Sequence, residues 1–359
     1  MIVVAKIGTT SLTDDHGEVD RSAIARLGAQ VAAVRALGHT VVLVTSGAIA
    51  AGMPRLAMTE RPEDPVTLQA LSAVGQSHLM GVYDEVLGGH GIVGGQVLLA
   101  PDDFFDRARY LRARGTLERL LELGVVPIIN ENDAVADDAI RFGDNDRIAA
   151  LLAHLVGAEM LVLLTDMAGV FTVDPRRDPD ASLIAEIAEV DDQLEAVAGG
   201  GSRLGSGGMA SKLSAAKIAS WSGVTTVIAA ADRPNVLVDA VTGRDDVGTT
   251  VRARAAQLPA RRLWIAFAVR AAGRVAVDAG ARRALVERGT SLLPVGVTSV
   301  EGDFGVGDAV EVVGPDGSVF AKGLVAVTSV EMRAIAGQHS DENLLPDEVI
   351  HRDDLVVLP

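Results

Sequence analysis

Two lysines in unusual surroundings are the first residues of this sequence that could do chemistry. Lys6 follows the apolar run "IVVA" and precedes Gly8, so it lies where a buried strand turns over a glycine. Lys212 closes the glycine-rich stretch "GGGSRLGSGGMASK" and opens a helix-like segment at residues 212–220. Glycines let backbone amides approach an anion, and a lysine at a helix start adds its charge to the positive end of the dipole. A snorkelling lysine and a plain surface loop are the simpler readings, but together the two lysines fit a phosphoryl group held between cations.

An acidic segment, "NENDAVADDAIRFGDND" at residues 130–146, could face those cations. It sets six carboxylates against a single Arg141: Glu131, Asp133, Asp137, Asp138, Asp144 and Asp146. An apolar helix follows at residues 147–157, so one of Asp144, Asn145 and Asp146 should be its N-cap. The other two, with Asn130 and Asp133 at a strand end, could hold an ammonium group or orient the lysines. We expect the middle of the segment to be an exposed connector.

Several common kinds of site do not match this sequence. Ser211 rather than glycine precedes Lys212, so there is no Walker A motif, and no GxGxxG follows a predicted strand. The segment lacks the ligand spacing and the closing glutamate of an EF-hand. There are no cysteines, and the seven histidines have no zinc-binding spacing. "TSGA" is not a nucleophile elbow, so hydrolase and zinc chemistry are disfavoured.

The elements that must position these residues are short β-branched runs separated by helix-like stretches. Six strands are predicted, at residues 2–5, 40–44, 96–100, 125–129, 160–164 and 225–230. Their hydrophobicity is continuous rather than alternating, as in strands covered on both faces. The segment at residues 21–38 has apolar positions at helical spacing. The pattern predicts an α/β fold, a three-layer sandwich around a largely parallel sheet.

Polar or glycine-rich residues follow four of these strands: Lys6 to Thr10, Thr45 to Gly47, Asn130 to Asp133, and Thr165 with Asp166. Any strand can leave a sheet through polar turn residues. However, ligands of open α/β sheets bind outside the carboxyl ends of the strands, and four such ends together favour a site there.

The residue pattern of the sequence changes near Arg254. A basic, linker-like stretch precedes short alternating segments, and "PDG" between two β-rich runs indicates a hairpin. We predict a catalytic domain at residues 1–253, a linker at 254–270 and a small, mostly β domain at 271–359.

Composition limits the function classes. The 359 residues are 48% hydrophobic, which suffices for a sizeable core, and the net charge is −16. That charge argues against a protein built to neutralise a nucleic-acid backbone, but not against a small anionic ligand. The longest apolar runs are too short to cross a membrane, and "MIVVAKIG" has no export signal, so a cytoplasmic protein is expected.

Six motifs together resemble one family. "KIGTTSL", "VTSGAIAAG", "INENDAV", "GDND", "LLTD" and "SGGMASK", in this order and spacing, are similar to glutamate 5-kinase of the amino acid kinase superfamily. The resemblance covers essentially the whole chain, because "RGTSLLPVGVTSVEGDFGVGD" is similar to the C-terminal PUA domain of the bacterial enzymes. The resemblance implies the amino acid kinase fold followed by a PUA domain.

The resemblance implies phosphorylation of the γ-carboxylate of L-glutamate by ATP, the first step of proline biosynthesis. Lys6 and Lys212 would then stabilise the transferring phosphoryl group, and Asp146 would orient both. The residues implied for glutamate are Ser46, Gly47, Asn130, Asp133, Asp144 and Asn145. Those implied for ATP are Lys6, Gly8, Thr165, Asp166, Ser206, Gly207, Gly208, Met209, Ala210, Ser211 and Lys212. "KIGTT", Ala210 and Ser211 depart slightly from the usual family pattern, which could tune nucleotide affinity.

Partners and regulation follow from the same resemblance. Mg²⁺ would accompany the nucleotide, with no dedicated protein metal site predicted. Proline would be a feedback inhibitor, a glutamyl phosphate reductase would use the product, and the chain would form a homo-oligomer.

Two alternatives stay open. Other members of the superfamily, such as acetylglutamate or aspartate kinases, share the fold and the phosphate-binding lysines. An RNA-binding protein acting through the PUA domain is a different class, but residues 270–359 hold eight Lys/Arg and fourteen Asp/Glu, which is poor for RNA.

Overall fold

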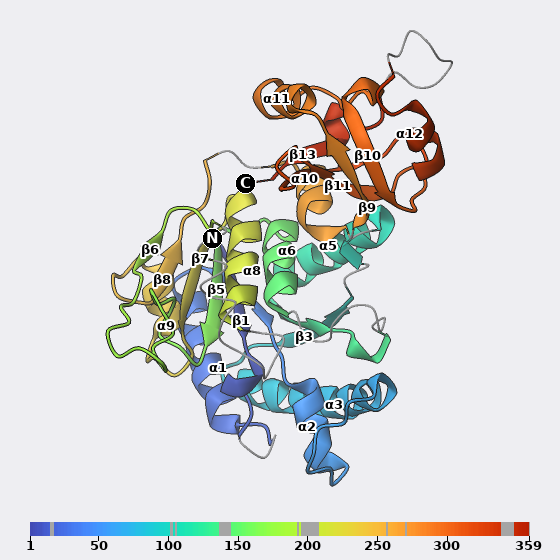
Figure 1. The fold of residues 1–359 in the computed structure, drawn as a ribbon. Coiled ribbons are helices and arrows are strands. Elements are labelled where there is room, and N and C mark those ends of the chain that lie inside the picture. The colour runs from blue at the N-terminus through green and yellow to red at the C-terminus, as the bar shows by residue number, and fades with distance from the viewer. Residues whose placement is uncertain are drawn as a thin grey trace. The chain divides into compact units, whose positions relative to one another are not determined.

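The computed structural model describes residues 1–14, 18–100, 103–104, 106–135, 145–191, 194, 208–255, 258–269, 271–338 and 348–358 (Figure 1). The chain divides into two compact units, residues 1–257 and 258–359. Each unit has a sheet of its own. The domain and linker boundaries read from the sequence stay a prediction.

The first unit is built on an eight-stranded sheet in the order β3-β4-β2-β1-β5-β7-β8-β6. Its strands are β1 (Ile2–Ile7), β2 (Thr40–Val44), β3 (Gly94–Leu99), β4 (Val126–Glu131), β5 (Met160–Thr165), β6 (Glu186–Ile187), β7 (Thr225–Ala230) and β8 (Thr249–Val251). Neighbouring strands run parallel except β7 and β8. All six predicted strands are present, and the prediction of a largely parallel α/β sheet is confirmed.

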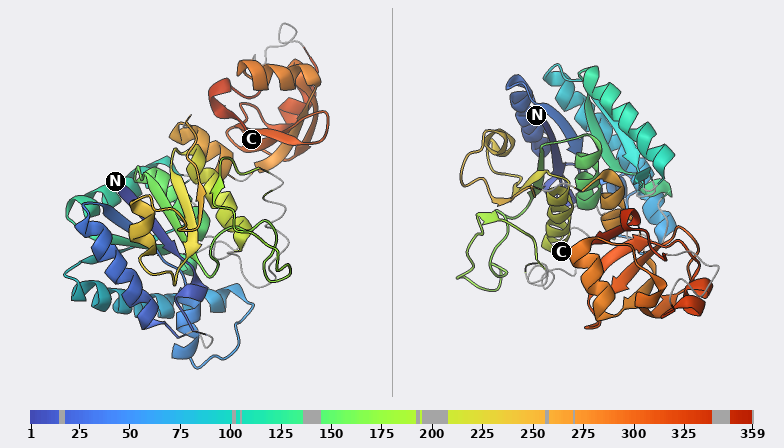
Figure 2. Two further views of the ribbon diagram at one scale, coloured as in Figure 1. Left: turned by 90° about the vertical axis from the view of Figure 1, so that its left-hand side faces the viewer. Right: turned by 90° about the horizontal axis from the view of Figure 1, so that it is seen from above.

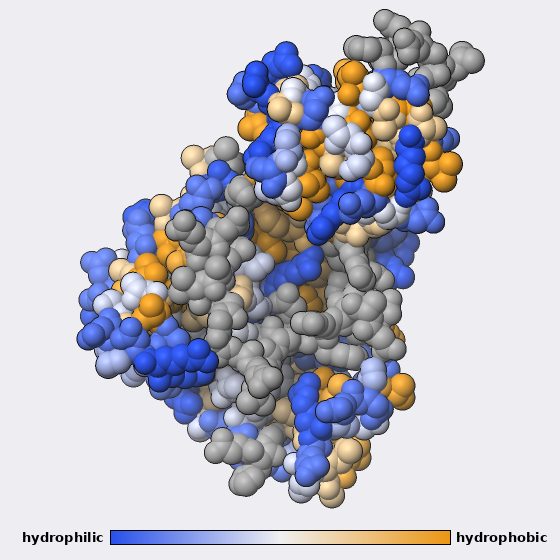
Figure 3. Space-filling model, viewed as in Figure 1, coloured by the Kyte–Doolittle hydropathy of each residue, from blue (hydrophilic) through white to orange (hydrophobic). Residues whose placement is uncertain are grey.

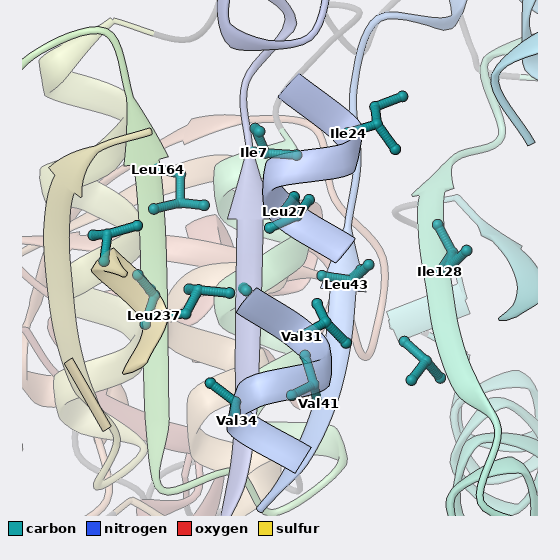
Figure 4. Close-up of a cluster of buried hydrophobic side chains, with 14 of the residues drawn as sticks. Ile7, Ile24, Leu27, Val31, Val34, Val41, Leu43, Ile128, Leu164 and Leu237 are labelled. Carbon is teal, nitrogen blue, oxygen red and sulfur yellow. The ribbon is translucent and has the colours of Figure 1, made fainter. Parts of the chain in front are cut away.

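Helices cover both faces of this sheet (Figures 1 and 2). The helices of the first unit are α1 (Arg21–Ala36), α2 (Ala48–Arg55), α3 (Pro65–Gly89), α5 (Arg107–Glu122), α6 (Asn145–Leu155), α8 (Met209–Trp221) and α9 (Val236–Val241). On one face α1, α3 and α9 enclose a continuous apolar core with alternate residues of the strands. Figure 4 shows the part of this core that lies under α1 and beside Leu237 of α9. On the other face α6 and α8 pack together against the central strands. The predicted helices at residues 21–38 and 212–220 correspond to α1 and α8.

Local sequence explains where the helices of the first face begin and how two of them meet. Asp20 caps α1 by accepting from the backbone amides of Ser22 and Ala23, and Asp64 caps α3 ahead of Pro65. Helices α2 and α3 cross so closely that an ideal Cβ on Gly75 would lie only 1.8 Å from the carbonyl oxygen of Ala48. Only a glycine fits at this point of the crossing. This crossing fixes α3 against the start of α2, beside the end of β2.

The second unit is a five-stranded sheet in the order β10-β9-β11-β12-β13. Its elements are α10 (Ala260–Leu263), a π-helix (Trp264–Ala268), β9 (Ala271–Val277), α11 (Ala279–Arg288), β10 (Val297–Gly302), β11 (Ala309–Val313), β12 (Val319–Leu324), α12 (Ser329–Ile335) and β13 (Leu355–Val357). Strands β11 and β12 pair antiparallel across the "PDG" turn, where Gly317 has φ of +79°, so the hairpin prediction is confirmed. The expectation of a small, mostly β structure in the C-terminal part of the chain is also confirmed.

The face of the molecule drawn in Figure 3 is mixed in polarity. On the face drawn in Figure 3, hydrophilic residues are spread over both units, with hydrophobic residues in small groups between them. Among the residues described, no helix combines the length and the apolar character needed to cross a membrane.

Candidate active site

The functional side chains gather at the carboxyl edge of the first sheet. In the strand register Lys6 lies level with Val44 of β2 and Leu163 of β5. The polar residues that follow β2, β4 and β5 therefore extend beyond the sheet on the same side as the end of β1. Strand β1 lies between β2 and β5, where the strand order reverses, and such switch points form ligand crevices.

Asp146 joins the two candidate lysines. Its Oδ1 lies 2.7 Å from Nζ of Lys6, and its Oδ2 lies 3.2 Å from Nζ of Lys212. The three side chains are at most 5% exposed. Lys6 comes from β1, Asp146 from the first turn of α6 and Lys212 from the first turn of α8. Three elements far apart in sequence thus meet through one carboxylate.

The charges of this trio do not cancel. Burial would raise the pKa of Asp146, but the positive charges of Lys6 and Lys212 and their hydrogen bonds outweigh burial and lower it. Asp146 is therefore ionised, and two ammonium groups share one carboxylate. Two buried ammonium groups held close together by one carboxylate suit an anion with several oxygens, such as a terminal phosphate.

Glycines leave room beside these cations. An ideal Cβ on Gly8 would lie 3.8 Å from Nζ of Lys6, so the missing side chain keeps the approach to the ammonium open. Gly208 is the extended N-cap of α8 and brings no capping side chain, and three residues later Ser211 donates from Oγ to Oδ2 of Asp146 at 3.1 Å. The free amide groups of a helix start bind anions well. Gly8 and the start of α8 thus fit the phosphates of a nucleotide.

A second polar cluster consists of amide side chains. Asn145, at the start of α6, donates from Nδ2 to Oγ of Ser46 at 3.1 Å and to Oδ1 of Asn130 at 3.2 Å. Ser46, Asn130 and Asn145 are all buried. Gly47 follows Ser46 with φ of +94°, a conformation that favours glycine, and starts α2. The structure thus brings together four residues that the sequence assigned to one amino-acid pocket.

Asp133 is a buried carboxylate just beyond the end of β4, the strand that carries Asn130. Oγ of Ser72, on α3, donates to Oδ2 of Asp133 at 2.8 Å. Burial raises the pKa of Asp133, and the hydrogen bond from Ser72 and the charge of Arg61 only partly oppose it. A carboxylate in this position gains from a cationic partner, because an ammonium group would offset its desolvation.

Thr165 and Asp166 lie at the end of β5. Thr165 is buried, and its Oγ1 donates to Oδ1 of Asp166 at 3.0 Å. Asp166 also forms an ion pair with Arg176, in which Nη2 of Arg176 lies 3.2 Å from Oδ2 of Asp166. This pair stands beside the strand that carries Lys6, as expected for residues of a nucleotide site, although its role stays a prediction.

Some predicted residues cannot be placed. Asp144, Ser206, Gly207 and most of the predicted exposed connector lie outside the described residues. Asn145 and Asp146 belong to α6 itself, so of the three candidate N-caps only Asp144 precedes the helix. In the described part of the chain no three His, Asp or Glu side chains are grouped as metal ligands.

Sequence reasoning missed two residues, Ser72 and Gln76, which are buried on α3. Oε1 of Gln76 accepts from Nδ2 of Asn130 at 2.7 Å. The signal that could have found them is a pair of polar residues four positions apart on the buried stripe of an otherwise apolar helix.

This fold and this site define an amino acid kinase joined to a PUA domain. The model of the amino acid kinase family matches residues 1–230, and that of the PUA domain matches residues 273–344. Within the family, the chain belongs to the glutamate 5-kinases. It is 48% identical to "Glutamate 5-kinase" from Burkholderia multivorans over 99% of this chain and 97% of that protein. The "Glutamate 5-kinase" of Burkholderia cenocepacia (strain HI2424) is also 48% identical over the same shares.

A solved structure supports the fold. The carbamate kinase from Giardia lamblia bound to AMP-PNP superposes with a TM-score of 0.50 at 18% identity, over 70% of this chain and 98% of that chain. At this identity the likeness concerns the fold alone.

Proposed function

We propose that the protein transfers the γ-phosphoryl group of ATP to the γ-carboxylate of L-glutamate, giving L-glutamyl 5-phosphate and ADP. One observation carries the proposal. Asp146, which holds the two phosphate-facing lysines, adjoins Asn145, which belongs to the buried amide cluster. A cation pair for a phosphoryl group and a polar pocket for an amino acid therefore meet at the start of α6.

The phosphoryl end of the site works by charge and position. Lys6 and Lys212 would contact the oxygens of the transferring group, while Asp146 keeps both ammonium groups in place. A carboxylate oxygen of glutamate attacks the γ-phosphorus, the bond from that phosphorus to the β,γ-bridging oxygen breaks, and ADP leaves with the electron pair. The glutamate side chain has a pKa of about 4.3 and is ionised at neutral pH, so the nucleophile needs no general base.

ATP would lie along the glycine-rich edge. Gly8, Gly208, Met209, Ala210 and Ser211 would surround its phosphates, with Ser206 and Gly207 in the same stretch, and Thr165 and Asp166 would line the nucleotide nearby. Mg²⁺ would come with the nucleotide, because phosphate oxygens and water fill most of its octahedral shell and few protein ligands are needed.

The glutamate end of the site would use Asp133 for the substrate ammonium group. Ser46, Asn130 and Asn145 would contact the rest of the amino acid, with Gly47 presenting its backbone, and the resemblance to the family adds Asp144 to this set. An N-acetylated substrate has no ammonium group for a buried carboxylate, and aspartate is one methylene shorter, so free glutamate fits best among the substrates of the superfamily.

Further proposals concern the cell and regulation. The product is a reactive acyl phosphate, so a reductase that consumes it would act next in proline biosynthesis, in the cytoplasm. Proline has an α-carboxylate and a cationic amine, and we infer that it inhibits by competing in the glutamate pocket. Inhibition that does not change with glutamate concentration would count against this. A homo-oligomer is also expected.

A hydroxamate assay tests the activity. Purified protein with ATP, Mg²⁺, L-glutamate and hydroxylamine should form the γ-hydroxamate of glutamate. Lys212→Ala should abolish turnover, whereas Lys217→Ala, five positions along the same helix, should leave it near the unmodified rate. Activity with only aspartate or N-acetylglutamate would refute the proposed substrate.

A further inference from the structure

Three buried carboxamides form a chain of hydrogen bonds among the residues proposed to bind glutamate. Nδ2 of Asn145 donates to Oδ1 of Asn130, and Nδ2 of Asn130 donates to Oε1 of Gln76. In the part of the protein that the structure describes, this amide chain has two unpartnered ends, Oδ1 of Asn145 and Nε2 of Gln76. Buried polar atoms almost always have partners, so a free acceptor and a free donor within one site need an explanation.

The backbone fixes the direction of this amide chain. The amide N–H of Glu131 donates to Oδ1 of Asn130 at 2.9 Å, so that oxygen cannot exchange places with the nitrogen. Nδ2 of Asn130 must then face Gln76, and only Oε1 of Gln76 can accept from it. Consequently the N–H groups of Gln76 Nε2 cannot point toward Asn130. The orientation of the three amides therefore accounts for the donor that has no partner.

In the order of these hydrogen bonds, Gln76 is the end of the amide chain that is removed from Asp146 and the lysines. It stands four positions after Ser72 on α3, and Ser72 holds Asp133. Residues four apart lie on the same face of a helix. Asn145, at the other end of the amide chain, precedes Asp146 and the lysines. The free donor therefore belongs with the carboxylate proposed for the substrate ammonium group, not with the phosphoryl site.

We propose that Nε2 of Gln76 donates a hydrogen bond to the α-carboxylate of the substrate, so that Gln76 and Asp133 together recognise the α-amino acid. The inference rests on the proposed function, since it needs an amino acid whose γ-carboxylate faces Lys6 and Lys212. The α-carboxylate supplies the missing acceptor next to the α-ammonium group, and the two are joined through a single carbon atom. Gln76 thus determines specificity for the end of the substrate that does not react.

The substitution Gln76→Glu separates this role from a structural one. Glutamate keeps an oxygen that accepts from Asn130 and nearly the same shape, but it replaces the free donor by an acceptor with a negative charge. The KM for L-glutamate should rise about 10- to 100-fold, as for loss of a hydrogen bond to a charged group, while kcat changes little. Gln96→Glu, the same change at an exposed position of β3, should match the unmodified protein.

A substrate analogue gives the reverse effect. L-isoglutamine has a carboxamide in place of the α-carboxylate and keeps the γ-carboxylate, so its N–H groups can donate to the carboxylate introduced at position 76. The ratio of kcat/KM for L-isoglutamine to that for L-glutamate should rise at least about tenfold in Gln76→Glu. An unchanged ratio, an unchanged KM or an equal loss of kcat for both substrates would overturn the inference.

Two controls keep the outcome readable. Should Gln76→Glu fail to fold, Gln76→Met removes the donor without adding charge, although it also removes the oxygen that accepts from Asn130. A raised glutamate KM with kcat retained is then expected, and an unchanged KM would be the contrary result. If the unmodified protein makes no γ-hydroxamate from L-glutamate, the proposed function itself has failed. If the unmodified protein makes the γ-hydroxamate and the Gln76 variants keep its KM for L-glutamate, the proposed function stands and this inference alone is wrong.

Discussion

Nζ of Lys6 lies 2.7 Å from Oδ1 of Asp146, and both side chains are buried. The pair ties the end of the central strand β1 to the first turn of α6, and Lys212 extends it to α8. We expect this carboxylate to matter both for stability and for the proposed chemistry, because removing it would take away the negative charge that lies between two buried cations.

The first prediction removes that carboxylate. Asp146→Asn should lower kcat at least about 100-fold and Tm by about 5–15 °C, since both buried lysines lose the charge of the carboxylate that lies between them. Lys212→Met combined with Asp146→Asn should restore part of the lost Tm but none of the activity, because the double variant no longer buries two cations of like charge close together. Thermal unfolding and the hydroxamate assay measure both effects, and additive losses of Tm in the double variant would contradict the prediction.

The pH dependence of the unmodified protein follows from the same carboxylate. The folded-state pKa of Asp146 is lowered, so its contribution to stability is fully present above the unfolded-state pKa and is lost as the pH falls through the folded-state value. The acid limb of a Tm-against-pH curve should therefore be steeper in the unmodified protein than in Asp146→Asn.

The second prediction concerns Asp133 and has the opposite sign for stability. Its pKa is raised by burial, so the folded state holds the proton more tightly than the unfolded chain, and the free protein loses stability as the pH rises through the raised value. At neutral pH Asp133→Asn should raise Tm by about 1–4 °C, because Ser72 can still donate to the new amide oxygen. The glutamate KM should rise about tenfold or more through loss of the charge facing the ammonium group.

Asp84→Asn is the matched control for Asp133→Asn. Asp84 is exposed on α3, and its replacement should change neither Tm nor KM appreciably. A fall in Tm for Asp133→Asn would show that the carboxylate stabilises the fold, and a normal KM would show that it does not bind the ammonium group of glutamate.

Much of the fold could be read from the sequence because the central strands are continuous β-branched runs. Strands β6 and β8 were not predicted, since they have only two and three residues and carry no periodic pattern. The hairpin at Gly317 could be predicted because its turn needs a residue with positive φ, a requirement that shows locally in the sequence as a glycine.

The residues of the candidate site that follow strands could be predicted from the sequence. Those that a helix supplies were harder to predict. Lys6, Ser46, Asn130 and Asp133 lie at or just after strand ends, whose common edge follows from the parallel sheet alone. Gln76 meets Asn130 across 54 positions of sequence, and no local pattern sets that distance. Its contact depends on how closely α3 crosses α2, which only the packed structure determines.

That crossing gives the last prediction. An ideal Cβ on Gly75 would lie 1.8 Å from the carbonyl oxygen of Ala48 and 2.5 Å from the amide nitrogen of Gly52, which are both backbone atoms. Gly75→Ala must push α3 away from α2, so Tm should fall by at least about 4 °C and the glutamate KM should rise as Ser72 and Gln76 shift. Gly81, exposed on the same helix, has nothing within 4 Å of its ideal Cβ, so Gly81→Ala should gain about 0.5–1 kcal/mol from helix propensity and leave KM unchanged. Thermal unfolding and glutamate titrations of the two variants compare the same substitution at both positions. A stable Gly75→Ala protein with a normal KM would mean that the closeness of this crossing does not position the pocket.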